Sequence, residues 1–342
     1  MENKPLVSIC IPAYNGEHLI TRALDSCLKQ TYQNLEILVI DDCSKDNTIE
    51  VVKEYQKRSD KIRLIANEVN LGASKNFLKT FQEASGVFVQ HIGQDDWLDE
   101  NYIEEKVRAF DENPNVAFVG NPMKAYEKNE KDEIVYTGQN FKKHGIQTLE
   151  FILRKFYKEP GWLGFSCMMR KKDAVEQYLV SIPNKFGYEK FYEKAMAIDN
   201  ILLLRILSLP QYNGKYFYTT KTFYNTLSHS EHYSKDYGWM RSGNISDWLK
   251  FAHIDRVGYE FFLKTHPNKY LFFYRFHMGN YVLGNLVFDF ILGRAREGFS
   301  FEMLKFFFQD YSFVEKFLVC LNVLPNLFIR TFRWGLKKFN KK

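Results

Sequence analysis

Two neighbouring carboxylates, Asp95 and Asp96, stand just after an apolar segment of strand length at residues 87–92. Adjacent carboxylates at the end of a buried strand repel each other unless a positive charge lies beside them. Mg²⁺ and Mn²⁺ suit this position, because hard cations prefer oxygen ligands and commonly bind one or two carboxylates together with substrate phosphates. Alternatively, the pair opens the following helix, for which Asp99 is the better N-cap. The pair alone leaves both interpretations open.

A second acidic pair, Asp41-Asp42, follows an apolar segment at residues 36–40. One of these carboxylates can accept a hydrogen bond from a base N–H group, such as the one that uracil or thymine offers. Alternatively, Asp and Ser side chains in this position stabilise a turn by binding their own backbone. Both interpretations hold together if each residue of the pair serves one role.

The first 120 residues must position these carboxylates, and apolar periodicity predicts that strands and helices alternate along them. The predicted strands cover residues 6–11, 36–40, 62–66, 87–92 and 116–119, and the predicted helices cover 17–30, 47–58, 73–84 and 99–112. Strands separated by single helices form right-handed crossovers in a mainly parallel sheet. Since the strands are apolar almost throughout, we expect helices on both faces of the sheet. The predicted fold class is α/β and Rossmann-like.

Three polar segments follow predicted strands and are therefore expected to meet. Pro12, Ala13, Tyr14 and Asn15 follow the first strand, Asp41-Asp42 the second, and Asp95-Asp96 the fourth. In open α/β sheets, ligands bind outside the carboxyl ends of the strands. The first loop has no G-x-G-x-x-G sequence, which argues against a dinucleotide held by helix N-terminal amides. We expect a diphosphate that rests on a metal ion instead, with Lys75 as an additional basic contact.

The segments that carry this pattern resemble the family 2 glycosyltransferases of the GT-A fold, of the type that builds bacterial cell-surface polysaccharides. They are VSICIPAYN at residues 7–15, IDDCSKDNT at 40–48, NLGASKN at 70–76, and Asp95-Asp96. The resemblance implies an inverting enzyme that uses a UDP- or dTDP-sugar with Mg²⁺ or Mn²⁺. It also implies that Pro12, Ala13 and Tyr14 line the nucleotide pocket, that Asp42 contacts the base, that Asp95 lies near the ribose and that Asp96 binds the metal.

The same resemblance implies a catalytic base further along the chain, which takes the proton of the acceptor hydroxyl. The family places an acidic residue at the start of a helix with Arg some residues later, and Asp199 with Arg205 fits this pattern. Ile198 stands where the family usually has a first acidic residue. Asp199 alternatively serves only as the N-cap of a helix, with Glu189 and Glu193 as other acidic candidates for the base.

Many family members add a histidine to the metal site, and His229 is the candidate here, with His232 behind it. The sequence around His229 departs from the family's usual Arg-x-His, and an exposed loop histidine is the alternative. Residues 330–334 resemble the Gln-x-x-Arg-Trp of processive polysaccharide synthases, but Arg330 replaces the Gln. We therefore expect a non-processive enzyme that adds one sugar to a glycan or lipid-linked acceptor.

We expect two regions in the chain. Residues 1–235 form one catalytic domain, with 1–120 as the nucleotide-sugar-binding half and 121–235 as the acceptor-side half, because no linker rich in Pro, Gly or Ser interrupts them. The second half predicts a hairpin around 131–136, a helix near 146–157, strand or loop at 161–169, a helix near 199–209 and a strand at 216–224. Residues 236–342 predict amphipathic helices rich in Phe and Tyr.

The last of these helices carry aromatic residues and Leu at helical spacing and are followed by a basic tail. Its basic residues are Arg330, Arg333, Lys337, Lys338, Lys341 and Lys342. Such helices can lie in a membrane interface and favour anionic lipid, which would suit an acceptor carried on a lipid diphosphate. The alternative is a helical cap on the catalytic domain, or the interface of a homodimer, with a solvated tail.

The composition of the chain bears on its binding partners, the state of its cysteines and its location in the cell. A net charge of +6, with acidic and basic residues interleaved, argues against nucleic acid as a partner. Five scattered cysteines without a C-x-x-C pair indicate reduced thiols in a cytoplasmic protein. The first residues carry no apolar signal segment, and the longest uncharged stretch, 317–329, is shorter than the roughly 20 residues that span a bilayer. We therefore expect a cytoplasmic location, with peripheral binding to the inner face of the cell membrane as an option.

Two other functions fit parts of the pattern. A sugar-phosphate nucleotidyltransferase uses a related sheet but tends to carry a Gly-rich loop with a basic residue after the first strand, which residues 12–17 lack. A degenerate transferase that only binds sugar nucleotides is the other alternative. Intact Asp42, Asp95 and Asp96 argue against it, whereas Ile198 favours it.

Overall fold

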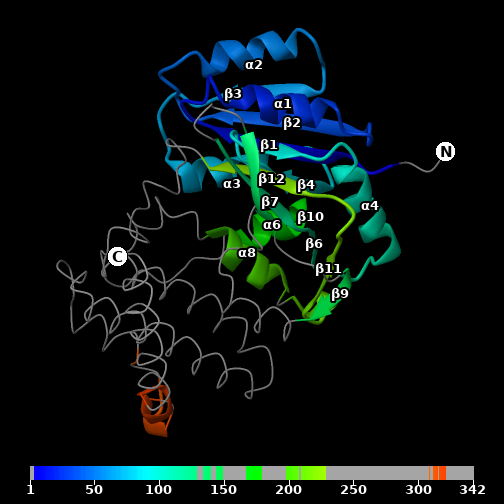
Figure 1. Ribbon diagram of the computed structural model, residues 1–342, viewed down its shortest axis with the longest axis vertical. Coiled ribbons are helices and arrows are strands. Elements are labelled where there is room, and N and C mark those ends of the chain that lie inside the picture. The colour runs from blue at the N-terminus through cyan, green and yellow to red at the C-terminus, as the bar shows by residue number, and fades with distance from the viewer. Residues whose placement is uncertain are drawn as a thin grey trace, which may run out of the picture. The chain divides into compact units, whose positions relative to one another are not determined.

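The computed structural model describes residues 4–128, 134–139, 144–148, 167–178, 198–207 and 209–228, and in the C-terminal part residues 308, 311–314 and 316–320. The chain divides into two compact units, residues 1–232 and 233–342. The labelled helices and strands all belong to the first unit (Figure 1). The predicted division at residue 235 stays a prediction, because few residues of the second unit are described.

An eight-stranded sheet forms the centre of the first unit, in the order β3-β2-β1-β4-β10-β6-β11-β9. Its strands are β1 (Val7–Ala13), β2 (Leu35–Asp41), β3 (Ile62–Ala66), β4 (Phe88–His91), β6 (Phe118–Gly120), β9 (Gly145–Thr148), β10 (Met168–Arg170) and β11 (Lys215–Tyr218). The first four strands pair in parallel, and so do β6 and β11. Strands β10 and β9 run antiparallel to their neighbours. The predicted α/β class with a mainly parallel sheet is confirmed.

The predicted helices of the first 120 residues are also present. They are α1 (Ile20–Leu28), α2 (Thr48–Gln56), α3 (Ala73–Glu83) and α4 (Tyr102–Glu112). Each buries one face, at the helical spacing seen in the sequence; in α1 the buried residues include Ile20, Ala23, Leu24 and Cys27.

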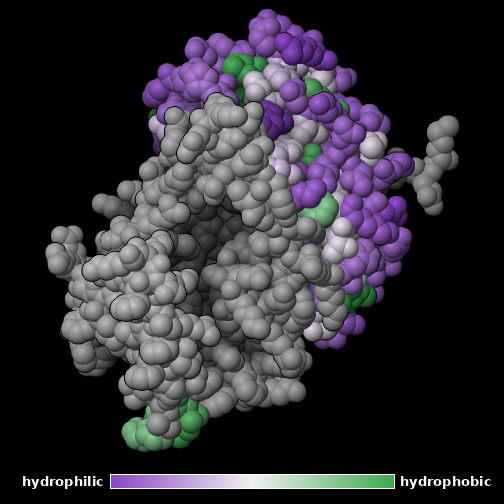
Figure 2. Space-filling view, in the orientation of Figure 1, coloured by the Kyte–Doolittle hydropathy of each residue, from purple (hydrophilic) through white to green (hydrophobic). Residues whose placement is uncertain are grey.

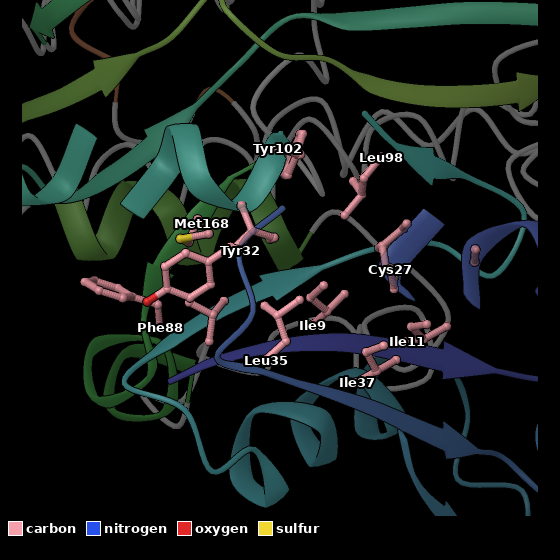
Figure 3. Packing of buried hydrophobic residues seen from close by; sticks show 14 of the residues in the cluster. Ile9, Ile11, Cys27, Tyr32, Leu35, Ile37, Phe88, Leu98, Tyr102 and Met168 are labelled. Atoms are coloured by element: carbon pink, nitrogen blue, oxygen red, sulfur yellow. The ribbon is translucent and has the colours of Figure 1, made fainter. Parts of the chain in front are cut away.

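Different helices cover the two faces of the sheet, because side chains alternate along each strand. Val7, Ile9 and Ile11 of β1 are fully buried in one hydrophobic cluster with residues of α1, α2 and α4 (Figure 3). Complete burial of such a side chain contributes about 1.5–3 kcal/mol. Cys10 faces the other way, where its thiol lies 3.7 Å from the carbonyl oxygen of Thr80 on α3. Helices therefore cover both faces, as predicted.

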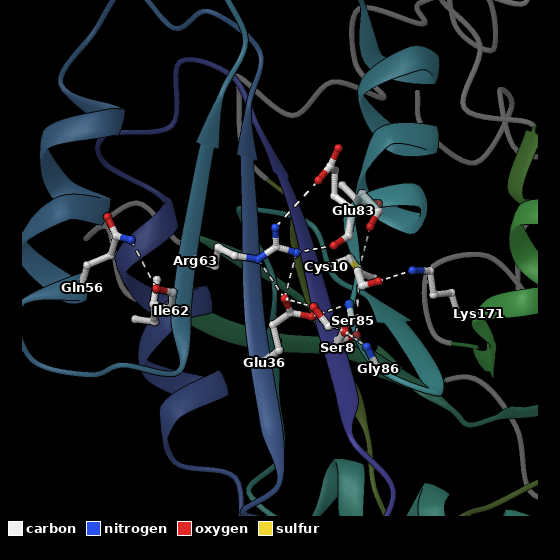
Figure 4. Close-up of polar contacts among 12 residues, drawn as sticks. Ser8, Cys10, Glu36, Gln56, Ile62, Arg63, Glu83, Ser85, Gly86 and Lys171 are labelled. Carbon is white, nitrogen blue, oxygen red and sulfur yellow. Dashed lines mark hydrogen bonds and ion pairs between the residues drawn. The ribbon is translucent and has the colours of Figure 1, made fainter.

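Glu36 on β2 links three neighbouring segments near the amino ends of the strands (Figure 4). Its carboxylate accepts hydrogen bonds from Ser8 on β1, from the N–H and hydroxyl of Ser85 at 2.8 and 3.0 Å, and from Arg63 on β3 at 2.9 Å. Burial by itself raises the pKa of Glu36, but these hydrogen bonds outweigh it and lower that pKa below its usual value. The cluster therefore holds an ionised carboxylate at the edge of the sheet opposite to the carboxyl ends.

A second sheet, in the order β5-β12-β7-β8, brings distant parts of the chain together. It consists of β5 (Trp97–Leu98), β7 (Met123–Lys128), β8 (Ile134–Gln139) and β12 (Tyr224–Ser228). Strand β12 pairs with β5, which follows Asp96 directly, and with β7. The antiparallel pair of β7 and β8 confirms the predicted hairpin, whose residues 129–133 lie outside the described part.

Two predictions for this half were wrong. The strand predicted at 216–224 is two strands, because residues 219–223 carry the chain from β11 in the main sheet to β12 in the second. The helix predicted near 146–157 does not begin there, because residues 146–148 belong to β9 and pair with β11. This pairing is non-local and overrides the local helical pattern; residues 149–157 lie outside the described part.

The other predicted elements of this half fit better. Helix α8 (Ile198–Leu207) confirms the helix expected near 199–209, and β10 lies at the end of the segment expected as strand or loop. Helix α6 (Lys171–Tyr178) and the short 3-10 helix η1 (Pro210–Tyr212) were not predicted.

The described cysteines agree with the expectation of reduced thiols. None of the five, all of which lie in the described part, forms a disulfide. Burial raises the pKa of Cys10 and of Cys27 to about 12, so both thiols keep their protons at neutral pH.

In the second unit, residues 313–314 and 316–320 are helical. Three apolar side chains there are exposed: Phe313 by 84%, Val314 by 58% and Phe317 by 55%. Figure 2 shows this segment as a hydrophobic surface. Within the described residues, every helix is too short or too polar to cross a lipid bilayer.

Candidate functional site

The loops after β1 and β2 meet at the carboxyl edge of the sheet. The N–H of Asn15 donates to Oγ of Ser44 at 2.9 Å, and Oδ1 of Asn15 accepts from the N–H of Lys45 at 2.8 Å. The N–H of Gly16 donates to Oγ1 of Thr48 at 2.7 Å. Asn15 has a φ of 47°, in the left-handed region that Asn tolerates better than most residues. The structure thus brings two of the three predicted segments together.

Gln94 joins the third segment to the first. Its side-chain amide makes two hydrogen bonds with the main chain of Tyr14: Oε1 accepts from the N–H and Nε2 donates to the carbonyl oxygen, both at 3.0 Å. A Cβ atom at Gly16 would lie 2.4 Å from Oε1 of Gln94, so glycine leaves room for this contact. Gln94 was not assigned a role from the sequence, since nothing local to it indicates a partner 80 residues away.

Asp41 takes the turn-stabilising role that was predicted for one member of the Asp41-Asp42 pair. Oδ1 of Asp41 accepts a hydrogen bond from the N–H of Ser44 at 2.9 Å, and Oδ2 accepts from the Ser44 hydroxyl. Asp41 therefore stabilises the turn after β2. This turn includes Cys43 with a φ of 64°.

Asp42 is only 3% exposed and holds a different loop. Its Oδ1 accepts from Nδ2 of Asn67 at 2.9 Å and from the N–H of Leu71 at 2.8 Å, and its Oδ2 accepts from the N–H of Gly72 at 2.9 Å. The carboxylate thus fixes the segment that leads into α3. Any ligand that bonds to Asp42 meets an acceptor whose direction is already set.

Two lysines of α3 lie beside this network. Lys75, predicted as a basic contact, is exposed in the first turn of the helix. Lys79 was not predicted; its Nζ donates to Oδ1 of Asn67 at 2.7 Å, and the amide of Asn67 donates in turn to Asp42. Two basic side chains on α3 therefore lie near the Asp42 network, and such side chains form strong hydrogen bonds with phosphate groups.

The two carboxylates after β4 converge over Gly93. A Cβ atom at Gly93 would lie 2.7 Å from Oδ1 of Asp95 and 2.7 Å from Oδ2 of Asp96. Both carboxylates therefore fold back against the main chain of Gly93, where a side chain would clash with them. Asp96 is 6% exposed, whereas Asp95 is half-buried.

Tyr224, the first residue of β12, contacts this pair from the second sheet. Its hydroxyl donates to Oδ2 of Asp96 at 2.6 Å and accepts from the N–H of Gly93 at 2.9 Å. Burial, and then the charge of Asp96, raise the pKa of Tyr224 well above its usual value, so the hydroxyl keeps its proton. No local sequence pattern indicates this role of Tyr224, because the contact spans 128 positions.

Asp99 does not cap the helix as predicted. Helix α4 begins at Tyr102 after Asn101, and the carboxylate of Asp99 instead accepts from the N–H of Phe223 and from Nδ2 of Asn225, both at 3.0 Å. Asp99 thus fastens β12 beside β5. A long-range contact has replaced the local one that the sequence suggested.

The donor set after β4 fits a hard divalent cation. Asp95 and Asp96 place two oxygen-donor side chains just after β4, and Mg²⁺ or Mn²⁺ commonly takes one or two carboxylates while substrate phosphates and water complete its ligands. No group of three or more His, Cys, Asp and Glu side chains gathers within the described residues.

The acceptor-side candidates lie where side chains are not described. Asp199 is the second residue of α8, inside the first turn of the helix, although the sequence suggested an N-cap as the alternative. His229, His232, Glu189 and Glu193 lie outside the described residues.

Comparison with known proteins places the first part of the chain in the family that its sequence segments resemble. Residues 8–179 match the family described as Glycosyl transferase family 2. The chain is 31% identical to glycosyltransferase GlyG of Streptococcus pneumoniae, over 58% of this chain and 70% of that protein. It is 40% identical to the Escherichia coli UDP-Glc:alpha-D-GlcNAc-diphosphoundecaprenol beta-1,3-glucosyltransferase WfgD, over 33% of this chain and 44% of that protein. The chain spans less than half the length of the first curated relatives that it matches.

The fold also resembles solved structures. Staphylococcus aureus TarS 1-349 in complex with UDP-GlcNAc superposes with a TM-score of 0.55 and 18% identity, over 94% of this chain and 80% of that one. At this identity the likeness shows a shared fold.

Proposed function

The chain belongs to glycosyl transferase family 2 and has the GT-A fold, and on that premise we propose that it is an inverting, non-processive glycosyltransferase. It moves a sugar from a UDP- or dTDP-sugar to a hydroxyl of a glycan or lipid-linked acceptor in cell-surface polysaccharide synthesis. The observation that carries this proposal is the junction of three loops at one sheet edge, where Gln94 and Tyr224 fasten the Asp95-Asp96 segment.

The nucleotide lies along the loop of Pro12, Ala13, Tyr14 and Asn15, with Asp42 accepting a hydrogen bond from the base. Support comes from the fixed direction of the Asp42 carboxylate and from the exposed position of Tyr14, at 44%. Asp95 contacts the ribose, and Lys75 adds positive charge near the diphosphate. WfgD is named for UDP-Glc, and the similar TarS structure is a complex with UDP-GlcNAc.

Asp96, with Asp95 beside it, holds Mg²⁺ or Mn²⁺, and His229 contributes a further ligand. A cation bound there would supply positive charge against the negative charge that develops on the leaving diphosphate. The chain's own part is to hold two carboxylates in place before the substrate arrives, which the contacts of Gly93 and Tyr224 support.

Asp199 acts as the base on the acceptor side. Its carboxylate takes the proton of the acceptor hydroxyl while that oxygen bonds to C1 of the sugar, and the bond from C1 to the diphosphate oxygen breaks. Attack opposite the leaving group inverts C1. The position of Asp199 in the first turn of α8 is compatible with this role, because a helix N-terminus keeps a carboxylate ionised, which is the form that accepts a proton.

Donor binding and nucleoside diphosphate release by the full chain test the proposal. With Mn²⁺ and a panel of UDP- and dTDP-sugars, we expect one donor to raise the melting temperature and to release its nucleoside diphosphate. Asp96→Ala should lose the metal-dependent part of binding. Asp199→Asn should keep donor binding and lose about 100-fold or more of the release rate. Exposed Asp60→Asn is the control and should match the wild type.

Other outcomes identify the alternatives. Formation of a sugar nucleotide from a nucleoside triphosphate and a sugar phosphate, with release of pyrophosphate, would indicate a nucleotidyltransferase. Donor binding without turnover in any acceptor mixture would indicate a protein that only binds. Wild-type donor affinity in Asp96→Ala would contradict the metal assignment.

The C-terminal helices bind the surface of an anionic membrane, where a lipid-linked acceptor would be found. Exposed Phe313, Val314 and Phe317 support this, together with the basic residues after position 329. Such binding would place a cytoplasmic protein at the inner face of the membrane. The full chain should pellet with vesicles that contain anionic lipid, and a chain truncated at Ser312 should not. Equal pelleting of both would contradict this part, and loss of a dimer on truncation would favour the dimer interface instead.

A further inference from the structure

Tyr224 lies at the junction of the second sheet and the Asp95-Asp96 segment. It is fully buried, and its backbone is held in register between Leu98 on β5 and Met123 on β7. From this fixed position its hydroxyl makes two hydrogen bonds, to Oδ2 of Asp96 at 2.6 Å and from the N–H of Gly93 at 2.9 Å. One hydroxyl thus contacts both ends of the segment at residues 93–96.

We propose that Tyr224 is a positioning residue for the metal-binding carboxylate of Asp96, a role that rests on the proposed function. A carboxylate at the end of a strand can rotate about its side-chain bonds. When a cation binds such a side chain, the loss of this rotational freedom lowers the binding affinity. The hydrogen bond from Tyr224 fixes Oδ2 beforehand. Because the donor is a neutral hydroxyl, it orients the carboxylate without cancelling the negative charge that attracts a cation.

Gly93 completes the arrangement. Its φ does not lie in the left-handed region, so conformation alone does not require glycine here. Space does: a Cβ atom would meet oxygens of Asp95 and Asp96, each at 2.7 Å. Tyr224 therefore holds one carboxylate from the side while Gly93 lets both fold over the main chain.

The ring and the hydroxyl of Tyr224 do different things. The ring belongs to the hydrophobic cluster and packs edge-to-face with Tyr102, with centroids 6.4 Å apart. Phenylalanine keeps this packing and removes only the hydroxyl. A matched control exists in Tyr55, whose hydroxyl also donates to a carboxylate, Oδ1 of Asp25 at 2.8 Å, but between α1 and α2.

The test compares Mn²⁺ binding by full-length wild type, Tyr224→Phe and Tyr55→Phe. Free Mn²⁺ is measured by its electron paramagnetic resonance signal during titration in saturating UDP, and folding is checked by circular dichroism. We expect Tyr224→Phe to lose about tenfold or more in Mn²⁺ affinity, as is typical when a residue behind a metal ligand is removed. UDP affinity without metal should stay within about twofold of wild type, and Tyr55→Phe should bind Mn²⁺ as wild type does.

Gly93→Ala gives a second route if Tyr224→Phe does not fold. It leaves the hydroxyl in place and should also weaken Mn²⁺ binding by about tenfold or more, because both carboxylates must move. If Tyr224→Phe folds and binds Mn²⁺ with wild-type affinity, the positioning role is overturned. If Tyr224→Phe does not fold, wild-type Mn²⁺ affinity in Gly93→Ala overturns it. Wild-type Mn²⁺ affinity in Asp96→Ala would instead overturn the metal site of the proposed function, so the two failures are distinguishable.

Discussion

Replacement of Asp42 by Asn should destabilise the protein even when no nucleotide is present. The carboxylate accepts three hydrogen bonds, from Asn67 and Leu71 on Oδ1 and from Gly72 on Oδ2. An amide offers one acceptor oxygen, so at least one main-chain N–H of the loop then faces an NH₂ group. Loss of one hydrogen bond to a charged acceptor costs about 1.5–3 kcal/mol. The remaining bonds weaken because a neutral acceptor is the poorer one.

We therefore expect Asp42→Asn to lower the free energy of unfolding by about 3 kcal/mol, with a further loss of nucleotide affinity. Urea unfolding of the nucleotide-free protein measures the first effect by linear extrapolation. Asp60→Asn, an exposed site without a described partner, should change the free energy of unfolding by less than about 0.5 kcal/mol. If Asp42→Asn unfolds like the wild type and only nucleotide binding suffers, then the carboxylate serves the ligand alone and the reasoning is refuted.

Two further predictions concern hydrogen bonds made by Gln94 at the candidate site and by Glu36 at the opposite edge of the sheet. Gln94→Ala removes both hydrogen bonds to the main chain of Tyr14. We expect the affinity for UDP in the presence of Mn²⁺, measured by calorimetry, to fall about tenfold. Unchanged affinity would mean that the loops after β1 and β4 hold their positions without the Gln94 side chain. Glu36→Gln tests pH dependence. Burial opposes ionisation of Glu36, but hydrogen bonds from Ser8, Ser85 and Arg63 lower its pKa below the unfolded value of about 4.3, so ionised Glu36 stabilises the fold at pH 7. That stabilisation is lost as the pH falls through the folded pKa. In urea unfolding, the deficit of Glu36→Gln should therefore be largest at pH 7 and shrink near pH 3, and an equal deficit at both pH values would contradict the argument.

The sequence predicted the first 120 residues well because the signals there are local. Apolar β-branched segments alternate with segments of helical spacing, and each signal lies within the element that it predicts. The polar residues of the candidate site, from Pro12 to Asp96, could be found for a related reason. They stand at or directly after the carboxyl ends of buried strands, and parallel strands place such residues at one edge.

Tertiary structure decided the strand pairings and side-chain contacts that join residues far apart in the sequence. The local pattern at residues 216–224 is that of one strand, yet β11 pairs with β6 and β9 while β12 pairs with β5 and β7. Gln94 and Tyr224 acquired their contacts with the site in the same way, across 80 and 128 positions. Composition and spacing can show which carboxylates stand at a strand end. Only the folded chain determines which hydroxyl and which amide hold them there, because those hydrogen bonds join segments that are far apart in the sequence and meet only in the tertiary structure.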